Sequence, residues 1–482
     1  MHSLILVVFP LLAGLAVLFL KEAPARRLAV VTVALEALFA IVLAALFGRG
    51  DTVHYALDLP WVPAWGISFR LGLDGISLVL VLLTVLVTPV ALLLAARNPA
   101  TRTPVFYALV LAVETGLLGV FAARDAIVFY LFWELALVPV YFIAAIWGGE
   151  KRVAVTLKFF IYTVVGSLLM LFGILYVYFY TLLPHSFSLE AFYTASLPGD
   201  AAIWLFACFF AAFAVKMPVF PFHTWQSDTY HEAPAAGTVL LAALMAKMGA
   251  YGAMRWLLPV LPDGMHAWQW VVLALSLIGV VWGSIIALTQ KDMKRLLAWS
   301  SFAHTGLIAA GIFSLSFAGL QGAVVQMAAH GIAIAALFLV VDIVETRTGS
   351  RAIGQVGGLA HRAPLLAVVF MFALLSAIGL PLTAGFVGEF QLLYGVAQQG
   401  LAWALPGLVG VVLGAVYMLQ WFRKTMLGDA PAGSPAFAPT GVETTVLVSS
   451  AALLVFFGVW PKWLMDWSGP AVDALVQLVA WK

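Results

Sequence analysis

Two lysines lie inside long apolar stretches of this chain, and the first directly precedes two prolines. Lys216 ends an apolar run and is followed by Met217-Pro218-Val219-Phe220-Pro221. Prolines lack the amide hydrogen that a helix needs, so they predict a break immediately after the lysine. Inside a membrane, broken backbone persists only where protein or a wet cavity covers it, and a lysine there is costly unless it is paired, titrates or meets water. The pattern predicts an ion or proton path at Lys216, rather than a lysine whose amine reaches the membrane surface.

Other ionisable residues in apolar stretches could share a charge or a proton with Lys216. Glu134 lies in Phe129-Tyr130-Leu131-Phe132-Trp133-Glu134-Leu135. Burial disfavours a carboxylate and a nearby lysine favours it, so Lys216 is the obvious partner of Glu134. Lys247 lies one predicted helix later, and its alternative interpretation is a structural lysine that caps carbonyl groups.

Two histidines and a second glutamate follow in the later part of the chain. A single histidine in an apolar segment is more often a packed core residue, but His304 and His330 both lie between Lys247 and Glu389. Histidine suits a proton relay because it titrates near neutral pH and both ring nitrogens can take part. Neither has metal-ligand spacing with a Cys, Asp or Glu, so we expect no metal. The candidate proton path consists of Glu134, Lys216, Lys247, His304, His330 and Glu389.

The composition is that of a membrane protein. Of the 482 residues, 64% are hydrophobic and 10% are charged, whereas a soluble domain has about 25% charged residues. The one cysteine, Cys208, excludes an intrachain disulfide and a Cys-ligated iron–sulfur cluster. No nucleotide-binding motif is present, and the net charge of +2 gives no indication of a nucleic-acid partner. The apolar first twenty residues have no basic segment before them, so we expect a retained first helix.

The hydropathy pattern predicts an all-α polytopic fold with about fourteen transmembrane helices. The windows are 2–20, 28–47, 74–96, 104–122, 126–147, 157–181, 201–222, 234–258, 268–289, 296–313, 319–344, 364–395, 402–422 and 441–460.

The seventh and twelfth of these windows contain breaks, at Lys216-Met217-Pro218 and at Gly379–Phe386, and paired breaks are typical of an inverted-repeat transporter. We predict four regions: 1–103 with helices 1–3, 104–258 and 259–425 as two inverted five-helix repeats, and 426–482 with helix 14 and an interfacial amphipathic helix.

Basic residues gather in alternate loops and predict the orientation. One side carries Lys21, Arg26, Arg27, Arg97, Arg102, Lys151, Arg152, Lys291, Lys294, Arg295, Arg347, Arg351, Arg362, Arg423 and Lys424. The opposite side carries only Arg49, Arg70, Arg124, Arg255, Lys462 and Lys482. Because the basic side faces the cytoplasm, both termini are expected outside. The loop from about 48 to 72 is expected to be an interfacial cap without chemistry.

The motifs resemble the antiporter-like membrane subunits of respiratory complex I over nearly the whole chain, most closely the M type (chain 4 in mitochondrial usage). The segments that carry the resemblance are Leu73-Asp74-Gly75-Ile76-Ser77, Phe132-Trp133-Glu134-Leu135, Lys158-Phe159-Phe160-Ile161-Tyr162-Thr163, Val215-Lys216-Met217-Pro218, Lys247-Met248-Gly249-Ala250-Tyr251-Gly252, Ser300-Ser301-Phe302-Ala303-His304-Thr305-Gly306 and Gly385-Phe386-Val387-Gly388-Glu389-Phe390. The chain departs from the family at Gln226–His231, where many relatives have Leu-Pro-Asp-Ala-His.

The resemblance implies a proton-translocating subunit of NADH–quinone oxidoreductase in a bacterial inner membrane. It implies Glu134–Lys216 as a switch pair, Lys247 as the central lysine and Glu389 as the terminal group. The chain would hold no redox centre, with FMN and iron–sulfur clusters in partner subunits and L- and N-type chains as membrane partners. The alternative is a D-type subunit of a multisubunit cation/proton antiporter, which has similar charged residues.

Overall fold

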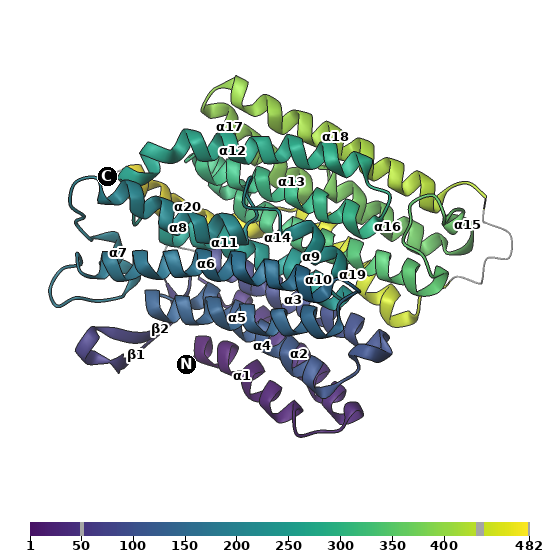
Figure 1. Ribbon diagram of the computed structural model, residues 1–482, viewed down its shortest axis with the longest axis horizontal. Helices are drawn as coiled ribbons and strands as arrows, with labels where there is room; N and C mark the ends of the chain where they lie inside the picture. The colour runs from purple at the N-terminus through teal and green to yellow at the C-terminus, as the bar shows by residue number, and fades with distance from the viewer. Residues whose placement is uncertain (49–52, 430–437, 481–482) are drawn as a thin grey trace. The chain divides into compact units, whose positions relative to one another are not determined.

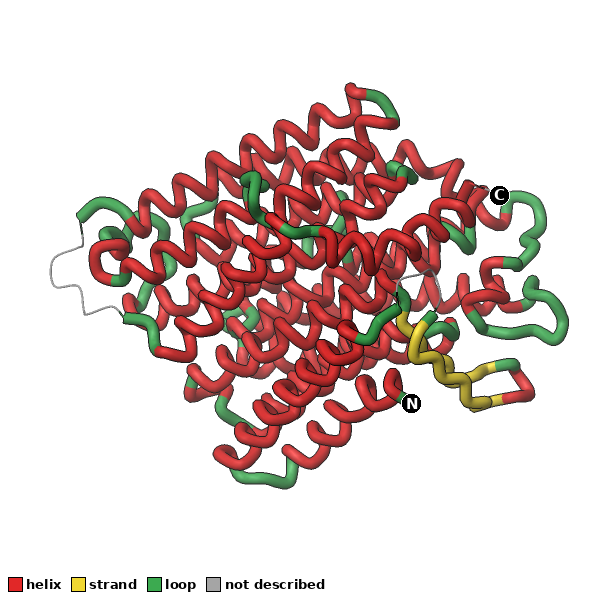
Figure 2. The backbone as a smooth tube through the Cα atoms, turned by 180° about the vertical axis from the view of Figure 1, so that it is seen from behind, coloured by secondary structure: helices red, strands yellow, loops and turns green. Residues whose placement is uncertain are grey.

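The computed structural model describes residues 1–48, 53–429 and 438–480, and in these residues the chain is helical almost throughout. Figure 2 shows the helices in red and a single two-stranded hairpin in yellow within the described part. Helices dominate because a spanning segment in lipid must satisfy its own backbone hydrogen bonds. The predicted outside residues Arg49 and Lys482 lie outside the described residues.

The chain divides into two compact units, which are described separately. The first unit contains Met1–Pro218, Glu232–Leu273 and Asp466–Lys482. The second unit contains Val219–His231 and Ala274–Met465. The four sequence regions proposed above stay a prediction.

The first unit is built from long apolar helices around α4. Its helices are α1 (His2–Val17), α2 (Glu22–Ala45), α3 (Gly75–Arg97), α4 (Pro104–Ala122), α5 (Ala126–Trp147), α6 (Arg152–Tyr178), α7 (Leu189–Tyr193), α8 (Ala201–Lys216), α10 (Ala235–Val239) and α11 (Ala246–Gly252). In Figure 1, α1, α2 and α5 lie beside α4, and α3 also packs on it.

Helix starts in this unit follow the expected capping chemistry. The side chains of Asp74, Thr103 and Asp125 accept hydrogen bonds from backbone amides in the first turns of α3, α4 and α5, respectively. These oxygens satisfy amides that have no partner within the helix.

The loop predicted as a cap contains a β-hairpin that the sequence analysis missed. Strands β1 (His54–Val62) and β2 (Ile67–Leu73) pair antiparallel, with an ion pair between Asp58 and Arg70. The amide of Ser68 donates to Asp125 at 3.2 Å, which fixes the hairpin to the start of α5. Pro60, Pro63 and Gly66 suggested an irregular loop, but the prolines lie at the end of a strand and in the turn.

The second unit is built around α14. It contains α9 (Gln226–Glu232) except for its last residue. Its other helices are α13 (Met293–Phe313), α14 (Phe317–Thr348), α15 (Leu359–Arg362), α16 (Pro364–Ala377), α17 (Ala384–Gln398), α18 (Leu401–Met426) and α19 (Gly441–Val459). Helix α14 packs against α13, α16, α17 and α19. Two helices, α12 (Pro262–Thr289) and α20 (Lys462–Ala480), belong partly to each unit.

Both predicted breaks are confirmed. Helix α8 ends at Lys216, and the next residues are turns. The twelfth window splits into α16 and α17. Between these two helices, Gly379 and Leu382 have φ values of +67° and +75°, which no helix can accommodate.

Within the described residues, eleven helices are long and apolar enough to cross a membrane. Three shorter apolar helices are α1, α8 and α16. The chain is therefore a multi-pass, all-α membrane protein, as predicted. The count of fourteen and the two inverted repeats stay predictions.

The predicted amphipathic tail is a helix, α20. Its apolar residues Val472, Leu475 and Val479 are buried, and the backbone of Trp467 lies against Gly75 at the start of α3. Its position at the membrane interface stays a prediction.

The break after Lys216 is packed against α11. Gly249 of α11 lies very close to the end of α8. A Cβ atom on residue 249 would be 2.5 Å from the backbone nitrogen of Met217 and 2.7 Å from the carbonyl oxygen of Phe213. Only glycine allows this approach, which brings the helix that carries Lys247 against the end of α8.

We predict that Gly249→Ala destabilises the protein by about 1–3 kcal/mol, because the new methyl group meets backbone that cannot move aside. The matched control is Gly441→Ala, since a Cβ at Gly441 meets nothing within 4 Å. The measurement is the heat resistance of each purified variant in detergent. Equal resistance of the two variants would show that the contact at Gly249 carries no constraint.

Candidate functional site

The side chain of Lys216 is buried at the end of α8. It is 2% exposed, and its Nζ lies 5.3 Å from the centre of the Trp133 ring in α5. A cation over an indole face gains about 2 kcal/mol when both are desolvated. Within the described residues Nζ has no hydrogen-bond partner. The aromatic face therefore stabilises a buried ammonium without fixing it in place.

Glu134 follows Trp133 in α5 and acts electrostatically on Lys216. Its Oε1 has no hydrogen-bond partner among the described residues, and the two side chains form no direct hydrogen bond. The structure thus brings Glu134 and Lys216 into one unit as interacting charges, without the close contact of a locked ion pair. Their predicted role as a switch stays a prediction.

Lys247 lies in α11 between two π-helical segments, Leu240–Met245 and Ala253–Leu257. It is 1% exposed, and its Nζ donates to the carbonyl oxygen of Ala242 at 2.7 Å. Wide π turns inside α-helices occur frequently at functional sites. The carbonyl contact is the one expected from a capping lysine.

The three later candidates form one cluster in the second unit. Nδ1 of His304 in α13 lies 3.3 Å from Oε1 of Glu389 in α17. The rings of His304 and His330 lie 5.2 Å apart, between centroids, with an interplanar angle of 53°. Gln326 in α14 donates to the same Glu389 oxygen at 3.3 Å. The structure therefore brings His304, His330 and Glu389 together.

The second helix break positions Glu389. A Cβ atom at Gly379 would overlap Oε2 of Glu389, so the carboxyl group fills the space that a side chain would take. Beside it is a cavity of about 20 Å³, lined among others by His304, Glu389, Ser284 and Tyr417. This is room for about one water molecule among polar groups.

Two contacts of the site were missed by the sequence analysis, those of Trp133 and Gln326. Trp133 stands next to Glu134 in the sequence, and its position by itself does not mark it as a partner of Lys216. Gln326 lies four residues before His330 in α14, so both can face one neighbour. A buried amide at that spacing from a candidate histidine is a signal that could have identified it.

Two buried glutamates lie apart from the six candidates. Glu36 in α2 and Glu114 in α4 are 2% and 0% exposed and interact electrostatically. Neither carboxyl oxygen of Glu36 has a hydrogen-bond partner in the described residues. In the same residues no group of three or more His, Cys, Asp or Glu side chains could hold a metal ion.

Known proteins resemble this chain over most of its length. The family model of the transmembrane part of NADH:quinone oxidoreductase and Mrp antiporter subunits matches residues 123–414. Subunit M of the NADH-quinone oxidoreductase of Rhodobacter capsulatus is 38% identical over 450 residues, which cover 91% of this chain and 87% of that protein. Chain 4 of the NADH-ubiquinone oxidoreductase of Arabidopsis thaliana is 32% identical over 98% of this chain and 96% of its own.

Solved structures show the same fold. A chain of respiratory complex I from Thermus thermophilus with bound NADH matches with a TM-score of 0.92 and 32% identity, covering 99% of this chain and 100% of that one. A chain of the Mrp complex from Dietzia sp. DQ12-45-1b matches with a TM-score of 0.88 and 22% identity, covering 99% of each, which shows the fold alone. Together with the motifs, these matches establish that the chain belongs to the NADH:quinone oxidoreductase/Mrp antiporter family, as a relative of subunit M of NADH-quinone oxidoreductase.

Proposed function

We propose that the chain is a proton-translocating membrane subunit of an NADH–quinone oxidoreductase. The single observation that supports this most strongly is the buried Lys216 at a helix break, held by the Trp133 ring and the field of Glu134. A lysine that only stabilised the fold would be expected to hold fixed hydrogen bonds, and Lys216 has none in the described residues.

The proposed mechanism is electrostatic. The field of Glu134 and the indole face of Trp133 stabilise the ammonium form of Lys216. When the Glu134 carboxylate moves away or is neutralised, desolvation favours the neutral amine. Lys216 then gives up its proton toward Lys247, and a returning Glu134 charge allows a new proton to bind.

The cluster in the second unit is proposed to be the later half of the path. His304 contacts Glu389 directly, and His330 packs beside His304, so a proton on one of these groups changes the energy of a proton on the next. Gln326 is a fixed neutral donor to Glu389. We propose that protons pass from the ionisable groups of the first unit to this cluster and leave on the outside.

The remaining parts of the proposal follow from the family. The chain works in a multisubunit complex beside L- and N-type membrane chains, while FMN and iron–sulfur clusters belong to partner subunits. The membrane is a bacterial inner membrane. Both termini lie on its outer face, because the loops rich in basic residues face the cytoplasm.

The alternative is a D-type subunit of a cation/proton antiporter. The Dietzia structure supports only the fold, because its identity is 22%. Identities of 38% and 32% to oxidoreductase subunits favour the first proposal. Flavoprotein and iron–sulfur genes beside this one would agree with it, and genes for small antiporter subunits would favour the alternative.

The first prediction concerns Glu134. Glu134→Ala should leave the complex assembled but reduce proton pumping coupled to quinone reduction by roughly ten-fold or more, while Glu134→Asp keeps part of it. The control is Glu150→Ala, at an exposed glutamate. Full pumping by assembled Glu134→Ala complex would remove Glu134 from the mechanism.

The second prediction concerns Lys216. Lys216→Arg keeps the positive charge, but a guanidinium does not release its proton in a protein. The variant should therefore assemble and pump nearly as poorly as Lys216→Ala. Proton uptake per quinone reduced is measured in vesicles against the amount of complex, with the exposed Lys151→Arg as control. Near-normal pumping would show that Lys216 is only a fixed charge.

The third prediction concerns orientation. In a Cys208→Ala background, single cysteines at Lys151 and Gln355 should react with an impermeant thiol reagent only from the cytoplasmic side. Cysteines at Asp58 and Pro198 should react only from the outside. All four positions are exposed, so accessibility does not limit labelling. Labelling of Asp58 from the cytoplasm would reverse the proposed topology.

A further inference from the structure

The small cavity beside Glu389 lies between four helices of the second unit. Its lining includes Ser284 in α12, His304 in α13, Glu389 in α17 and Tyr417 in α18. His304 and Glu389 belong to the candidate proton path, whereas Ser284 and Tyr417 do not. Two further polar side chains therefore border the cavity of the terminal carboxyl group, and they come from helices that carry none of the six candidates.

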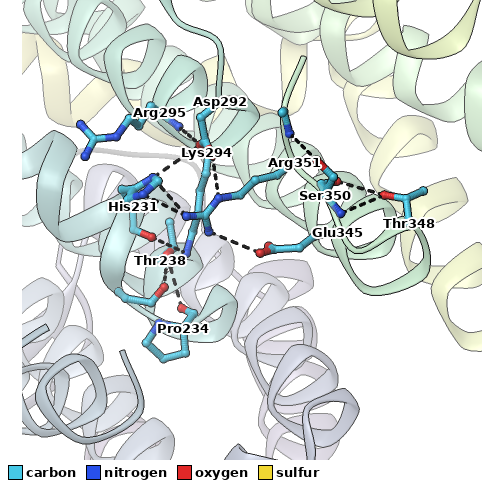
Figure 3. A network of polar contacts seen from close by, with 12 residues as sticks. His231, Pro234, Thr238, Asp292, Lys294, Arg295, Glu345, Thr348, Ser350 and Arg351 are labelled. Atoms are coloured by element: carbon cyan, nitrogen blue, oxygen red, sulfur yellow. Dashed lines mark hydrogen bonds and ion pairs between the residues drawn. The ribbon is translucent and has the colours of Figure 1, made fainter. Parts of the chain in front are cut away.

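The helix that forms the middle wall of this cavity, α13, is anchored at its start. Figure 3 shows Asp292 beside Arg295 and Arg351. Asp292 accepts the amide of Arg295 at 2.9 Å, and Nε of Arg351 lies 2.6 Å from the other Asp292 oxygen. The amide of Met293 donates to the carbonyl oxygen of Arg351 at 3.0 Å. These contacts fix the beginning of the helix that carries His304.

The hydroxyl group of Ser284 is buried at this cavity without a protein partner. Ser284 is 0% exposed, and within the described residues its Oγ has no hydrogen-bond partner. A hydroxyl group inside a helix can donate to the carbonyl oxygen four residues back, as Thr84 and Thr88 do in α3. Burial of a hydroxyl group is unfavourable unless it is hydrogen-bonded. Ser284 therefore indicates a small polar ligand in the cavity.

The neighbouring groups determine which hydrogen bonds that ligand must make. The hydroxyl group of Tyr417 donates to Oγ of Ser300 at 3.1 Å, so its single proton is used and its oxygen can only accept. Tyr417 interacts electrostatically with Glu389, whose carboxylate form also only accepts. A ligand among these groups must donate twice, and it can accept from Ser284. A water molecule has this set of donors and acceptors.

The size of the cavity also suits water. Its volume is about 20 Å³, enough for one molecule. Gly414 in α18 borders it, and a Cβ atom at Gly414 would come no closer to a neighbouring side chain than 3.6 Å, from the Tyr417 hydroxyl. At Gly410, one turn earlier, a Cβ atom would overlap Val280. Protein packing requires a glycine at 410 but not at 414, where the glycine leaves room beside the Tyr417 hydroxyl.

We propose that Ser284 and Tyr417 bind one water molecule against Glu389, and that this water exchanges protons with the Glu389 carboxyl group. Each transfer breaks one O–H bond and forms the next, from the carboxyl group to the water and from the water to the Tyr417 oxygen, as the Tyr417 proton moves to Ser300. The reverse sequence returns a proton to Glu389. The exchange rests on the proposed function, because it has a use only if the chain carries protons.

The first test is the water itself, and its outcome does not depend on pumping. Cryo-electron microscopy of the assembled complex, at a resolution that shows ordered waters elsewhere in it, should show one about 2.5–3.0 Å from Ser284 Oγ and from the Tyr417 hydroxyl oxygen. In Gly414→Ala the added methyl group should displace it. A wild-type map without a water at this place would overturn the proposal.

The second test separates the water from the fold. Gly414→Ala should lower proton uptake per quinone reduced by about ten-fold without lowering the heat resistance of the complex, since alanine favours a helix more than glycine does. The control Gly441→Ala, where a Cβ atom meets nothing within 4 Å, should pump like the wild type.

Tyr417→Phe keeps the ring and removes the hydroxyl group, so it provides a second variant if Gly414→Ala fails to assemble. It should lower proton uptake by a similar factor. Full pumping by both variants would overturn the role of the water as a proton carrier. A failure of the proposed function would instead appear as near-normal pumping by Lys216→Arg, so the two failures are distinguishable.

Discussion

A positive charge that must remain buried is the constraint on which the rest of the first unit depends. The Lys216 side chain is only 2% exposed, and the helix that carries it ends at that residue. An isolated ammonium in such a place is unfavourable by several kcal/mol. The indole ring of Trp133 and the charge of Glu134 make this position tolerable.

The second unit meets the opposite problem, a buried negative charge at a second helix break. Glu389 is 3% exposed and lies against His304 and Gln326. Gly379 has a left-handed backbone conformation and no side chain, which leaves the space that the carboxyl group of Glu389 occupies. In both units, therefore, an interrupted helix and an ionisable side chain occur together.

The sequence predicted much of this because the responsible signals are local. Pro218 and Pro221 indicate a helix break whatever the rest of the fold. A lysine or glutamate within an apolar run can likewise be recognised from the sequence alone. The features that the sequence did not predict are those that depend on contacts between distant segments. Trp133 as a cation contact, Gln326 as a donor to Glu389 and the hairpin of β1 and β2 each require knowledge of which distant segment lies opposite. The π turns around Lys247 also left no pattern in the hydropathy, because they keep the helix buried on all sides.

The central claim is that Glu134 and Lys216 act as one electrostatic unit, and a double-mutant cycle tests it most directly. Proton uptake per quinone reduced is measured for Glu134→Gln, for Lys216→Ala and for the double variant, each normalised to assembled complex. Groups that act only through each other show strongly non-additive losses. The account predicts that the double variant pumps no worse than the poorer single variant. Independent, multiplying losses would contradict it.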